Sequence, residues 1–156
     1  MSTKRLGTGE PTTSGHHAAW ELAAEARTAS LARALTGETL HAWRITDPAA
    51  VDDIVLMVDE LITNAIVHGA GPVRLRLRLD GARVVAEVTD DNPAAPGSPS
   101  SPPLLDWSEQ GRGLLLVAAL ASEFGCRPED PGKTVWFTRL LHTANGHTPN
   151  GRTRLT

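Results

Sequence analysis

The chain has 156 residues, a formal net charge of −3 at pH 7 and a single cysteine, Cys126. This length suits one domain with a hydrophobic core and is too short for two comfortable ones. The slightly acidic balance and scattered basic residues argue against binding to nucleic acid or anionic membranes, and one cysteine excludes an internal disulfide and a cysteine-based zinc site.

The two ends of the chain differ in composition from its middle. Residues 1–15 contain two early basic side chains with no apolar segment after them, which argues against a secretory signal. No apolar run approaches the length of a membrane span, so a cytoplasmic location is expected. We predict a flexible leader at 1–15, one domain at 16–141 and a disordered tail at 142–156.

The first predicted elements are an edge strand over residues 18–22 and an alanine-rich helix from residue 23 to about residue 35. Gly37 is expected to interrupt this helix, because glycine is a poor helix former. A short second helix is then expected to continue through residues 40–43.

A long helix is predicted between Asp47 and Gly71. Asp47 is a suitable N-cap, Pro48 suits the first helical position, and the GAGP sequence at 69–72 ends the helix. At about 100° per residue, the apolar positions form one arc that faces the core. These positions are Val51, Ile54, Val55, Val58, Leu61, Ile62 and Ala65.

Glu60, Asn64 and His68 recur every fourth residue and form one stripe along this helix. The stripe lies between the apolar arc and the solvent face, so its polar groups are expected to line a partly enclosed cleft. Two interpretations stay open here. The stripe is a functional site, or it holds only the polar residues that any long helix carries, with His68 complementing the helix dipole.

A β-hairpin is predicted next, because leucine and arginine alternate over residues 73–79 before an Asp-Gly turn and the sequence RVVAEVTD. The arginine row is interpreted as a solvated sheet face with Glu87 as a cross-strand partner, and a basic binding stripe is the alternative. Asp90 ends the second strand, where its carboxylate could accept a hydrogen bond from an exocyclic amine. The alternative is a simple Asp-Asn-Pro turn that includes Asn92.

Residues 92–103 contain five prolines, three serines and no charged side chain, which predicts a loop. Gly111, Arg112 and Gly113 then precede the sequence LLLVAALASEF, a predicted apolar helix that should be buried against a sheet. Two glycines at a helix N-terminus suit phosphate binding, although such pairs also occur as plain loop residues.

Two final strands are predicted near residues 124–128 and 134–140, with a turn at 130–132. The PGKT sequence at 131–134 is similar to the end of a P-loop. Position 127 is arginine instead of glycine, however, and a strand follows instead of a helix, so we treat the similarity as chance. Lys133 is interpreted as a turn residue or a distant phosphate contact, and Cys126 as a small packed residue and not a reactive thiol.

The predicted order is strand, helices, hairpin, loop, helix and hairpin. It indicates an α/β fold, a two-layer sandwich with a mixed, mainly antiparallel sheet and helices packed on one face. The connections between most strands are too short for the crossover helices of parallel Rossmann winding.

Four blocks appear in order: ELITNAIVHG, VTDDNP, GRGLLLVAAL and GKTVWF. Together they resemble the small anti-sigma-factor serine kinases of bacterial partner-switching systems, within the histidine-kinase-like ATPase (GHKL) superfamily. The resemblance covers roughly residues 18–140. It implies the histidine-kinase-like ATPase fold, with ATP and Mg²⁺ as cofactors.

By this resemblance, Asn64 would coordinate the Mg²⁺ that bridges the ATP phosphates, and Glu60 would act as general base or polarise the nucleophile. Asp90 would recognise the adenine amino group, the backbone near Gly111 and Gly113 would hold phosphate, and the proline-rich loop would be a lid. The implied nucleotide-binding positions are Asn64, His68, Asp90, Asn92, Gly111, Arg112, Gly113, Leu114 and Thr134.

The chain departs from the family pattern in its lid, because residues 92–105 contain no lysine or arginine. Capture of the γ-phosphate would then fall to Arg112 or to a residue from elsewhere. The resemblance implies a homodimeric serine kinase that phosphorylates an anti-sigma-factor antagonist and can sequester a sigma factor. The alternative is a catalytically silent ATP-binding module that regulates a protein partner through nucleotide-dependent lid ordering.

Overall fold

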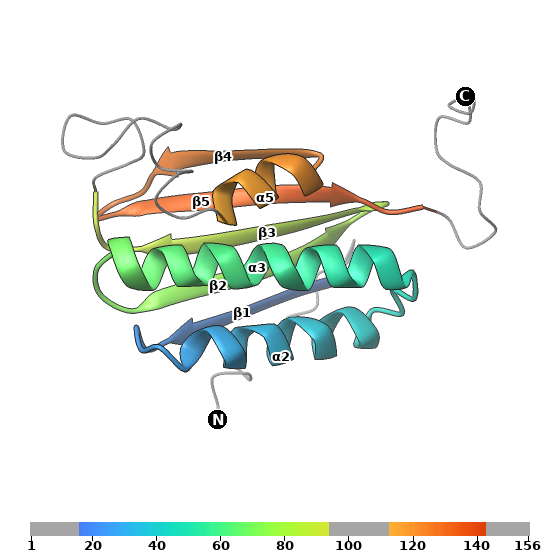
Figure 1. Cartoon of the computed structure of the whole chain (residues 1–156), viewed down its shortest axis with the longest axis horizontal. Helices are drawn as coiled ribbons and strands as arrows, with labels where there is room; N and C mark the ends of the chain where they lie inside the picture. The colour runs from blue at the N-terminus through green and yellow to red at the C-terminus, as the bar shows by residue number, and fades with distance from the viewer. Residues whose placement is uncertain (1–15, 94–112, 143–156) are drawn as a thin grey trace.

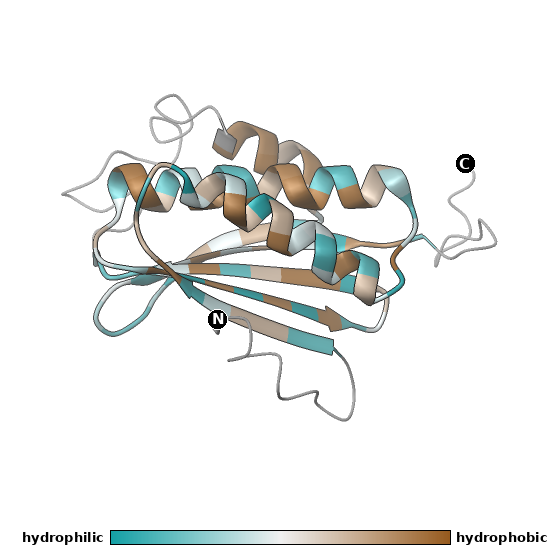
Figure 2. Cartoon of the chain, turned by 90° about the horizontal axis from the view of Figure 1, so that it is seen from below, coloured by the Kyte–Doolittle hydropathy of each residue, from teal (hydrophilic) through white to brown (hydrophobic). Residues whose placement is uncertain are grey.

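Three helices cover one face of a five-stranded sheet in the part of the chain that the structure describes (Figures 1 and 2). This computed structural model describes residues 16–93 and 113–142. The elements in chain order are β1 (His16–Leu22), α2 (Thr28–Ala42), α3 (Pro48–His68), β2 (Val73–Asp80), β3 (Arg83–Asp90), α5 (Gly113–Leu120), β4 (Glu123–Pro128) and β5 (Lys133–Leu140).

The strand order is β1-β2-β3-β5-β4, and each of the four neighbouring pairs is antiparallel. The predicted two-layer α/β sandwich with helices on one face is therefore confirmed. The first strand lies at one edge of the sheet, as predicted. The described strands contain no parallel pair, so the sheet is antiparallel throughout this part of the chain.

The alternating pattern of β2 explains how the two layers meet. Val73, Leu75 and Leu77 are fully buried beneath the helices, whereas Arg76 and Arg78 are exposed on the other face. Successive side chains of a strand point to opposite faces, so this alternation makes one apolar face and one solvated face. Burying each such leucine stabilises the fold by about 1.5–3 kcal/mol.

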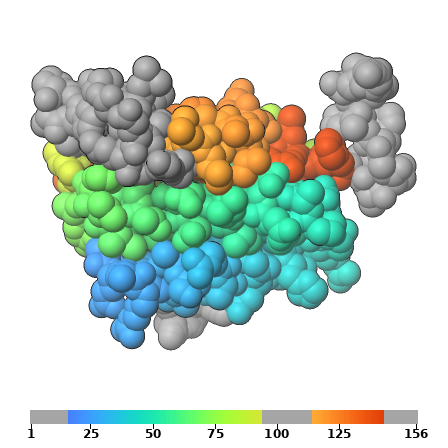
Figure 3. Space-filling view, viewed as in Figure 1, coloured from blue at the N-terminus to red at the C-terminus, as the bar shows by residue number. Residues whose placement is uncertain are grey.

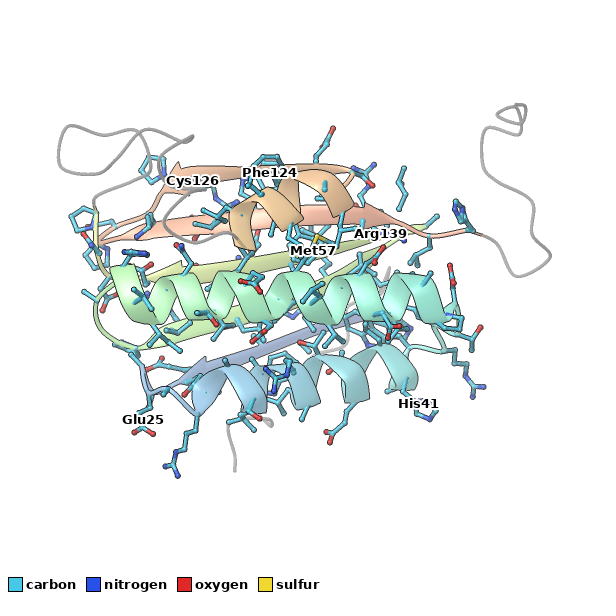
Figure 4. All side chains as sticks on the ribbon, viewed as in Figure 1. Glu25, His41, Met57, Phe124, Cys126 and Arg139 are labelled. Atoms are coloured by element: carbon cyan, nitrogen blue, oxygen red, sulfur yellow. The ribbon has the colours of Figure 1, made fainter. Side chains whose placement is uncertain are left out.

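The long helix α3 forms as predicted. Asp47 caps it, because its carboxylate accepts a hydrogen bond from the Ala49 N–H at 3.1 Å, and Pro48 occupies the first helical position. The predicted apolar arc faces the sheet (Figure 2), and its members are buried or half-buried. Arg139 of β5 also binds Asp53 of α3 at 2.9 Å, which ties the first half of the helix to the sheet (Figure 4).

The prediction of two helices broken at Gly37 is wrong, because α2 is one helix over Thr28–Ala42. Ala32, Thr36 and Leu40 follow at four-residue spacing and are completely buried. This stripe packs against α3, and tertiary packing outweighs the cost of about 1 kcal/mol for a glycine inside a helix. The helix also begins later than predicted, after turns at residues 24–27.

Replacing Gly37 with alanine is expected to stabilise the protein by about 0.5–1 kcal/mol. A Cβ atom at this position meets no atom within 4 Å, so the substitution adds helix propensity without a clash. Urea unfolding at 25 °C measures the effect. Gly81→Ala is the matched control: its Cβ also has open space, but its φ of +62° disfavours alanine, so this variant should lose stability. A destabilised Gly37→Ala variant would contradict a continuous α2.

The third helix, α5, ends earlier than predicted. It stops at Leu120, and Phe124, which the sequence placed in the helix as well as near a strand, lies in β4. Ser122 causes the change of direction, because its N–H donates to the Thr138 carbonyl and its hydroxyl accepts from the Leu140 N–H. These bonds join the chain to β5. Figure 3 shows α2, α3 and α5 as three adjacent bands.

The predictions about the chain ends and the lid lie mostly outside the described residues, which exclude 1–15, 94–112 and 143–156. Within the two described ranges, no helix combines the length and apolar character needed to cross a bilayer.

Candidate functional site

The C-terminal end of α3, the end of β3 and the start of β5 meet at one edge of the sheet, on the left in Figure 1. Two hydrogen bonds fasten the chain after β3 to the end of α3. The Asp91 N–H donates to the Ala70 carbonyl at 2.8 Å, and the Asn92 side-chain amide donates to the His68 carbonyl at 2.8 Å. Residues from three of the four sequence blocks, ELITNAIVHG, VTDDNP and GKTVWF, therefore lie together at this edge.

Asp90 is the centre of this edge and is only 2% exposed. Its Oδ1 atom accepts from the Asn92 N–H at 2.7 Å and from the Ala70 N–H at 3.4 Å. Gly69 permits the close approach, because a Cβ atom there would lie 2.6 Å from the Asp90 Cγ atom. The Asp-Asn-Pro turn expected as an alternative is present, and the same carboxylate is held in a fixed, buried position.

Sequence reasoning missed the partner of this carboxylate. Lys133 is the first residue of β5 and not a turn residue, and it is 4% exposed. Its Nζ atom lies 3.1 Å from Asp90 Oδ2 and 3.3 Å from Oδ1. The signal was present in KTVWFTRL: Lys133, Val135 and Phe137 alternate on the face that packs under the helices.

The α3 stripe carries the other polar groups. Asn64 is 8% exposed, and its side-chain amide makes no hydrogen bond to the residues that the structure describes. Its amide atoms are not among the fully buried polar atoms that lack a partner, so they keep some access to solvent, and the position suits a ligand or bound water. Fully buried Met57, seven residues earlier on the same side of α3, lies toward α5 in Figure 4. Asn64 therefore belongs to the side of α3 near α5.

Glu60 is half-buried one turn before Asn64. Burial raises the pKa of its carboxyl group above 4.5, and the negative charge of Asp59 raises that pKa further. A carboxylate with a raised pKa is a better proton acceptor, which is the property that a general base needs. His68 is half-buried at the end of α3, and its backbone carbonyl takes part in the contact with Asn92.

Only part of the segment predicted to bind phosphate lies within the described residues. Gly111 and Arg112 lie outside the described residues, as does the predicted lid beyond Pro93. Gly113 begins α5, as expected, and the Leu114 side chain is buried in the core. Leu114 could therefore contribute to a nucleotide site only through its backbone.

The structure does not bring Thr134 to the Asp90 carboxylate. Asp90 is opposite Lys133 in the β3–β5 register, so the next residue, Thr134, points to the other face of the sheet. There its hydroxyl lies 2.5 Å from the Thr89 hydroxyl. Thr134 also lines a hollow of about 490 Å³ together with Arg74 and other polar residues.

The arginine row lies on this solvated face, as interpreted from the sequence. Glu87 is opposite Arg76 in the register and binds it at 2.7 Å, and Arg127 of β4 binds the other Glu87 oxygen at 3.0 Å. Burial alone would raise the pKa of Glu87. The hydrogen bonds and positive charges of the two arginines outweigh that effect and lower the pKa below 4.5.

Glu87→Gln is expected to lower the free energy of unfolding by about 1 kcal/mol at pH 7. A carboxyl whose pKa is lower in the folded state contributes stability above the unfolded-state pKa, and this contribution disappears as pH falls through the folded pKa. The difference from wild type should therefore shrink below pH 4.5. Urea unfolding between pH 3 and pH 8 measures it, and a difference that does not change with pH would contradict the ionic origin.

Cys126 is half-buried in β4, and burial raises the pKa of its thiol. A protonated thiol is a poor nucleophile, which agrees with the interpretation as a packing residue. Within the described ranges, no three His, Cys, Asp or Glu side chains come together as a metal site. A metal ion at Asn64 would need oxygen ligands from a bound phosphate and water, a ligand set that suits Mg²⁺.

Comparisons with known proteins agree with this architecture. The model of the histidine kinase-like ATPase domain matches residues 22–139. A solved structure of the RsbU and RsbW domains of Rv1364c from Mycobacterium tuberculosis is 24% identical, with a TM-score of 0.60. The match covers 79% of this chain and 32% of that chain, and at this identity it shows similarity of fold. No curated protein matches the chain significantly.

Proposed function

Because this chain belongs to the histidine kinase-like ATPase domain family, we propose that it binds ATP with Mg²⁺ at the edge of the sheet where the end of α3, the end of β3 and the start of β5 meet. The observation that carries the proposal is the buried Asn64 amide, which has no hydrogen-bond partner among the described residues. It lies on the helix that ends beside the buried Asp90 carboxylate.

Each polar residue has a separate task in this proposal. The Asp90 carboxylate accepts a hydrogen bond from the adenine 6-amino group, and the Asn64 amide oxygen is a ligand of Mg²⁺. When bound, Mg²⁺ neutralises the charge of the phosphate oxygens. Asn64 and Glu60 lie one turn apart on one rigid helix, which fixes their relative positions before the nucleotide binds.

We further propose that the protein is a serine kinase of the anti-sigma-factor type. The sequence resemblance of four blocks supports this assignment, and the fold similarity to Rv1364c agrees with it. Glu60 accepts the proton of the partner's serine hydroxyl while the serine oxygen bonds to the γ-phosphorus. The bond to the bridging oxygen of the β-phosphate breaks, so phosphoserine and ADP are the products.

The proposed partner is a small anti-sigma-factor antagonist whose phosphorylation decides whether this protein, as a homodimer, sequesters a sigma factor. In this role the protein would regulate transcription without contacting nucleic acid, in the cytoplasm. The net charge of −3 gives the chain no general attraction to nucleic acid, which agrees with a protein as the partner.

A catalytically silent nucleotide-binding module is the second candidate function. The observation that favours it is the lack of lysine and arginine in residues 92–105, where a lid would cover the phosphates. In that case ATP orders the lid and thereby forms a surface for a protein partner. Formation of ADP that depends on Glu60 would exclude this candidate.

Calorimetric titration with ATP, ADP and GTP, with and without Mg²⁺, tests nucleotide binding. We expect ATP to bind more tightly with Mg²⁺ than without it, and Asn64→Ala to remove that difference while some ATP binding remains. Thr63→Ala is the matched control, because Thr63 is the adjacent residue on the exposed side of α3. If no nucleotide binds to the wild-type protein, the proposed function is wrong.

A further inference from the structure

A small hollow on the solvated face of the sheet has no role in the function proposed so far. It spans β1, β2 and β3 on the face turned away from the helices, so it is separate from Asn64 and Glu60 on α3 (Figure 2). Its volume is about 100 Å³. This is several times the space that one water molecule needs and well below the roughly 300 Å³ of the smaller drug-sized ligand sites, so the hollow suits an ion of a few heavy atoms.

The register of the sheet places the lining side chains together. His17 of β1 is directly opposite Arg78 of β2, and Arg78 is opposite Val85 of β3. Arg76 and Glu87 are the next opposite pair along the same face. These five residues line the hollow. Three adjacent strands therefore form it, and no loop has to move to complete it.

Positive charge is in excess in this hollow. Glu87 is the one acidic residue of the lining, and both of its oxygens are already bound to arginines. Its Oε1 atom accepts from Arg76 at 2.7 and 3.1 Å, and its Oε2 atom accepts from Arg127 at 3.0 Å. Arg76 and Arg78 together bring two positive charges against this single negative charge. With His17 counted as neutral, the lining carries one net positive charge.

Hydrogen-bond donors are in excess as well. An arginine side chain has five N–H donors, of which Arg76 uses its Nε–H and one Nη2–H for Glu87. The side chains of Arg78 and His17 make no hydrogen bond or ion pair to the residues that the structure describes. The His17 ring carries at least one N–H in either protonation state. A ligand that only accepts hydrogen bonds and carries negative charge therefore complements this lining.

The larger hollow on the same face lacks this excess. It contains Arg74 and Arg76, but Asp91, Glu129 and Asp130 line it too, and Arg74 binds Asp91 at 3.0 Å. Its carboxylates balance its arginines, so an anion would gain little there. The small hollow is the better anion site of the two.

We propose that the small hollow is a binding site for a tetrahedral oxyanion such as phosphate, held by the guanidinium group of Arg78, the remaining N–H groups of Arg76 and the ring of His17. Hydrogen bonds from a guanidinium group to a phosphate oxygen are strengthened by charge, and the planar guanidinium matches the spacing of two phosphate oxygens. The site goes beyond the proposed ATP function and does not depend on it, because the two lie on opposite faces of the sheet.

An NMR titration of the full chain with inorganic phosphate, at constant pH and ionic strength, tests this proposal. We expect saturable shifts of the His17 ring signals and the Arg78 backbone amide. Sulfate has the same tetrahedral shape and should produce the same saturation, whereas chloride should not. Shifts that do not saturate, or equal shifts with chloride, would show general screening of surface charge and would overturn the site. Neither result changes the ATP titrations that test the proposed function.

Arg78→Gln should weaken phosphate binding by about tenfold. Arg83→Gln is the matched control, because Arg83 is also exposed on this face of the sheet but is opposite Asp80 and does not line the hollow. The same loss of charge should change binding by less than about threefold there. Equal weakening in both variants would overturn the site, since it would show attraction by overall charge alone.

Glycerol 3-phosphate distinguishes two sources of the same chemical group. Binding weaker than that of inorganic phosphate would support the site and assign the free ion as its ligand. Binding as tight or tighter would support the site and assign a phosphate monoester. Absence of saturable binding for both compounds would overturn the proposal.

Discussion

Under the proposed kinase function, replacing Glu60 with glutamine is expected to slow phosphoryl transfer to a serine of the antagonist by about 10²–10⁴-fold while ATP binding stays within threefold of wild type. Glutamine has nearly the same shape as glutamate but cannot accept the serine proton. The nucleotide contacts proposed for Asn64 and Asp90 stay in place. Transfer of labelled phosphate from ATP to candidate antagonists, together with calorimetric titration of ATP, measures the two effects.

The pH dependence of the wild type gives a second measure of the same group. Burial and Asp59 raise the pKa of Glu60, so the fraction of the active carboxylate should fall at a higher pH than for an ordinary glutamate. The rate of transfer should fall as pH decreases toward that raised pKa, and the Glu60→Gln variant should lack this limb. Asp52→Asn is the matched control, since Asp52 is an exposed carboxylate two turns earlier on α3. A Glu60→Gln variant with the full rate would exclude Glu60 as the base.

Breaking the buried ion pair should have the largest effect on stability. Lys133→Met is expected to lower the free energy of unfolding by about 3–5 kcal/mol, because it leaves the buried Asp90 carboxylate without its counter-charge. Asp90→Asn should be destabilising for the converse reason. Unfolding in guanidinium chloride at pH 7 and 25 °C measures these changes.

Two comparisons separate this effect from a general loss of packing. The double variant Asp90→Asn/Lys133→Met carries no unpaired charge, so it should recover a large part of the stability lost in either single variant. Arg76→Met breaks a cross-strand ion pair with Glu87 on the solvated face, where the arginine side chain is 53% exposed, and should cost at most about 1 kcal/mol. Equal losses for Lys133→Met and Arg76→Met would contradict the importance of burial.

The sequence determined those elements whose signals are local. The Asp47-Pro48 start of α3, the alternation of β2 and the Asp-Gly turn before β3 depend on residues only a few positions apart, and the structure confirms all three. The apolar arc of α3 was visible for the same reason, because helix geometry alone fixes which of its residues share a face. The α/β sandwich then follows from the order of the elements.

Only the tertiary structure decided the features that depend on contacts between distant segments. Gly37 continues α2 because packing against α3 outweighs its poor intrinsic propensity, and α5 ends early because Ser122 bonds to β5. Lys133 pairs with Asp90, 43 residues earlier in the chain, because the β3–β5 register places the two residues opposite each other. The alternation within β5 puts Lys133 and Thr134 on opposite faces of the sheet, but only the alignment of two distant strands decides which residue of β3 each of them meets.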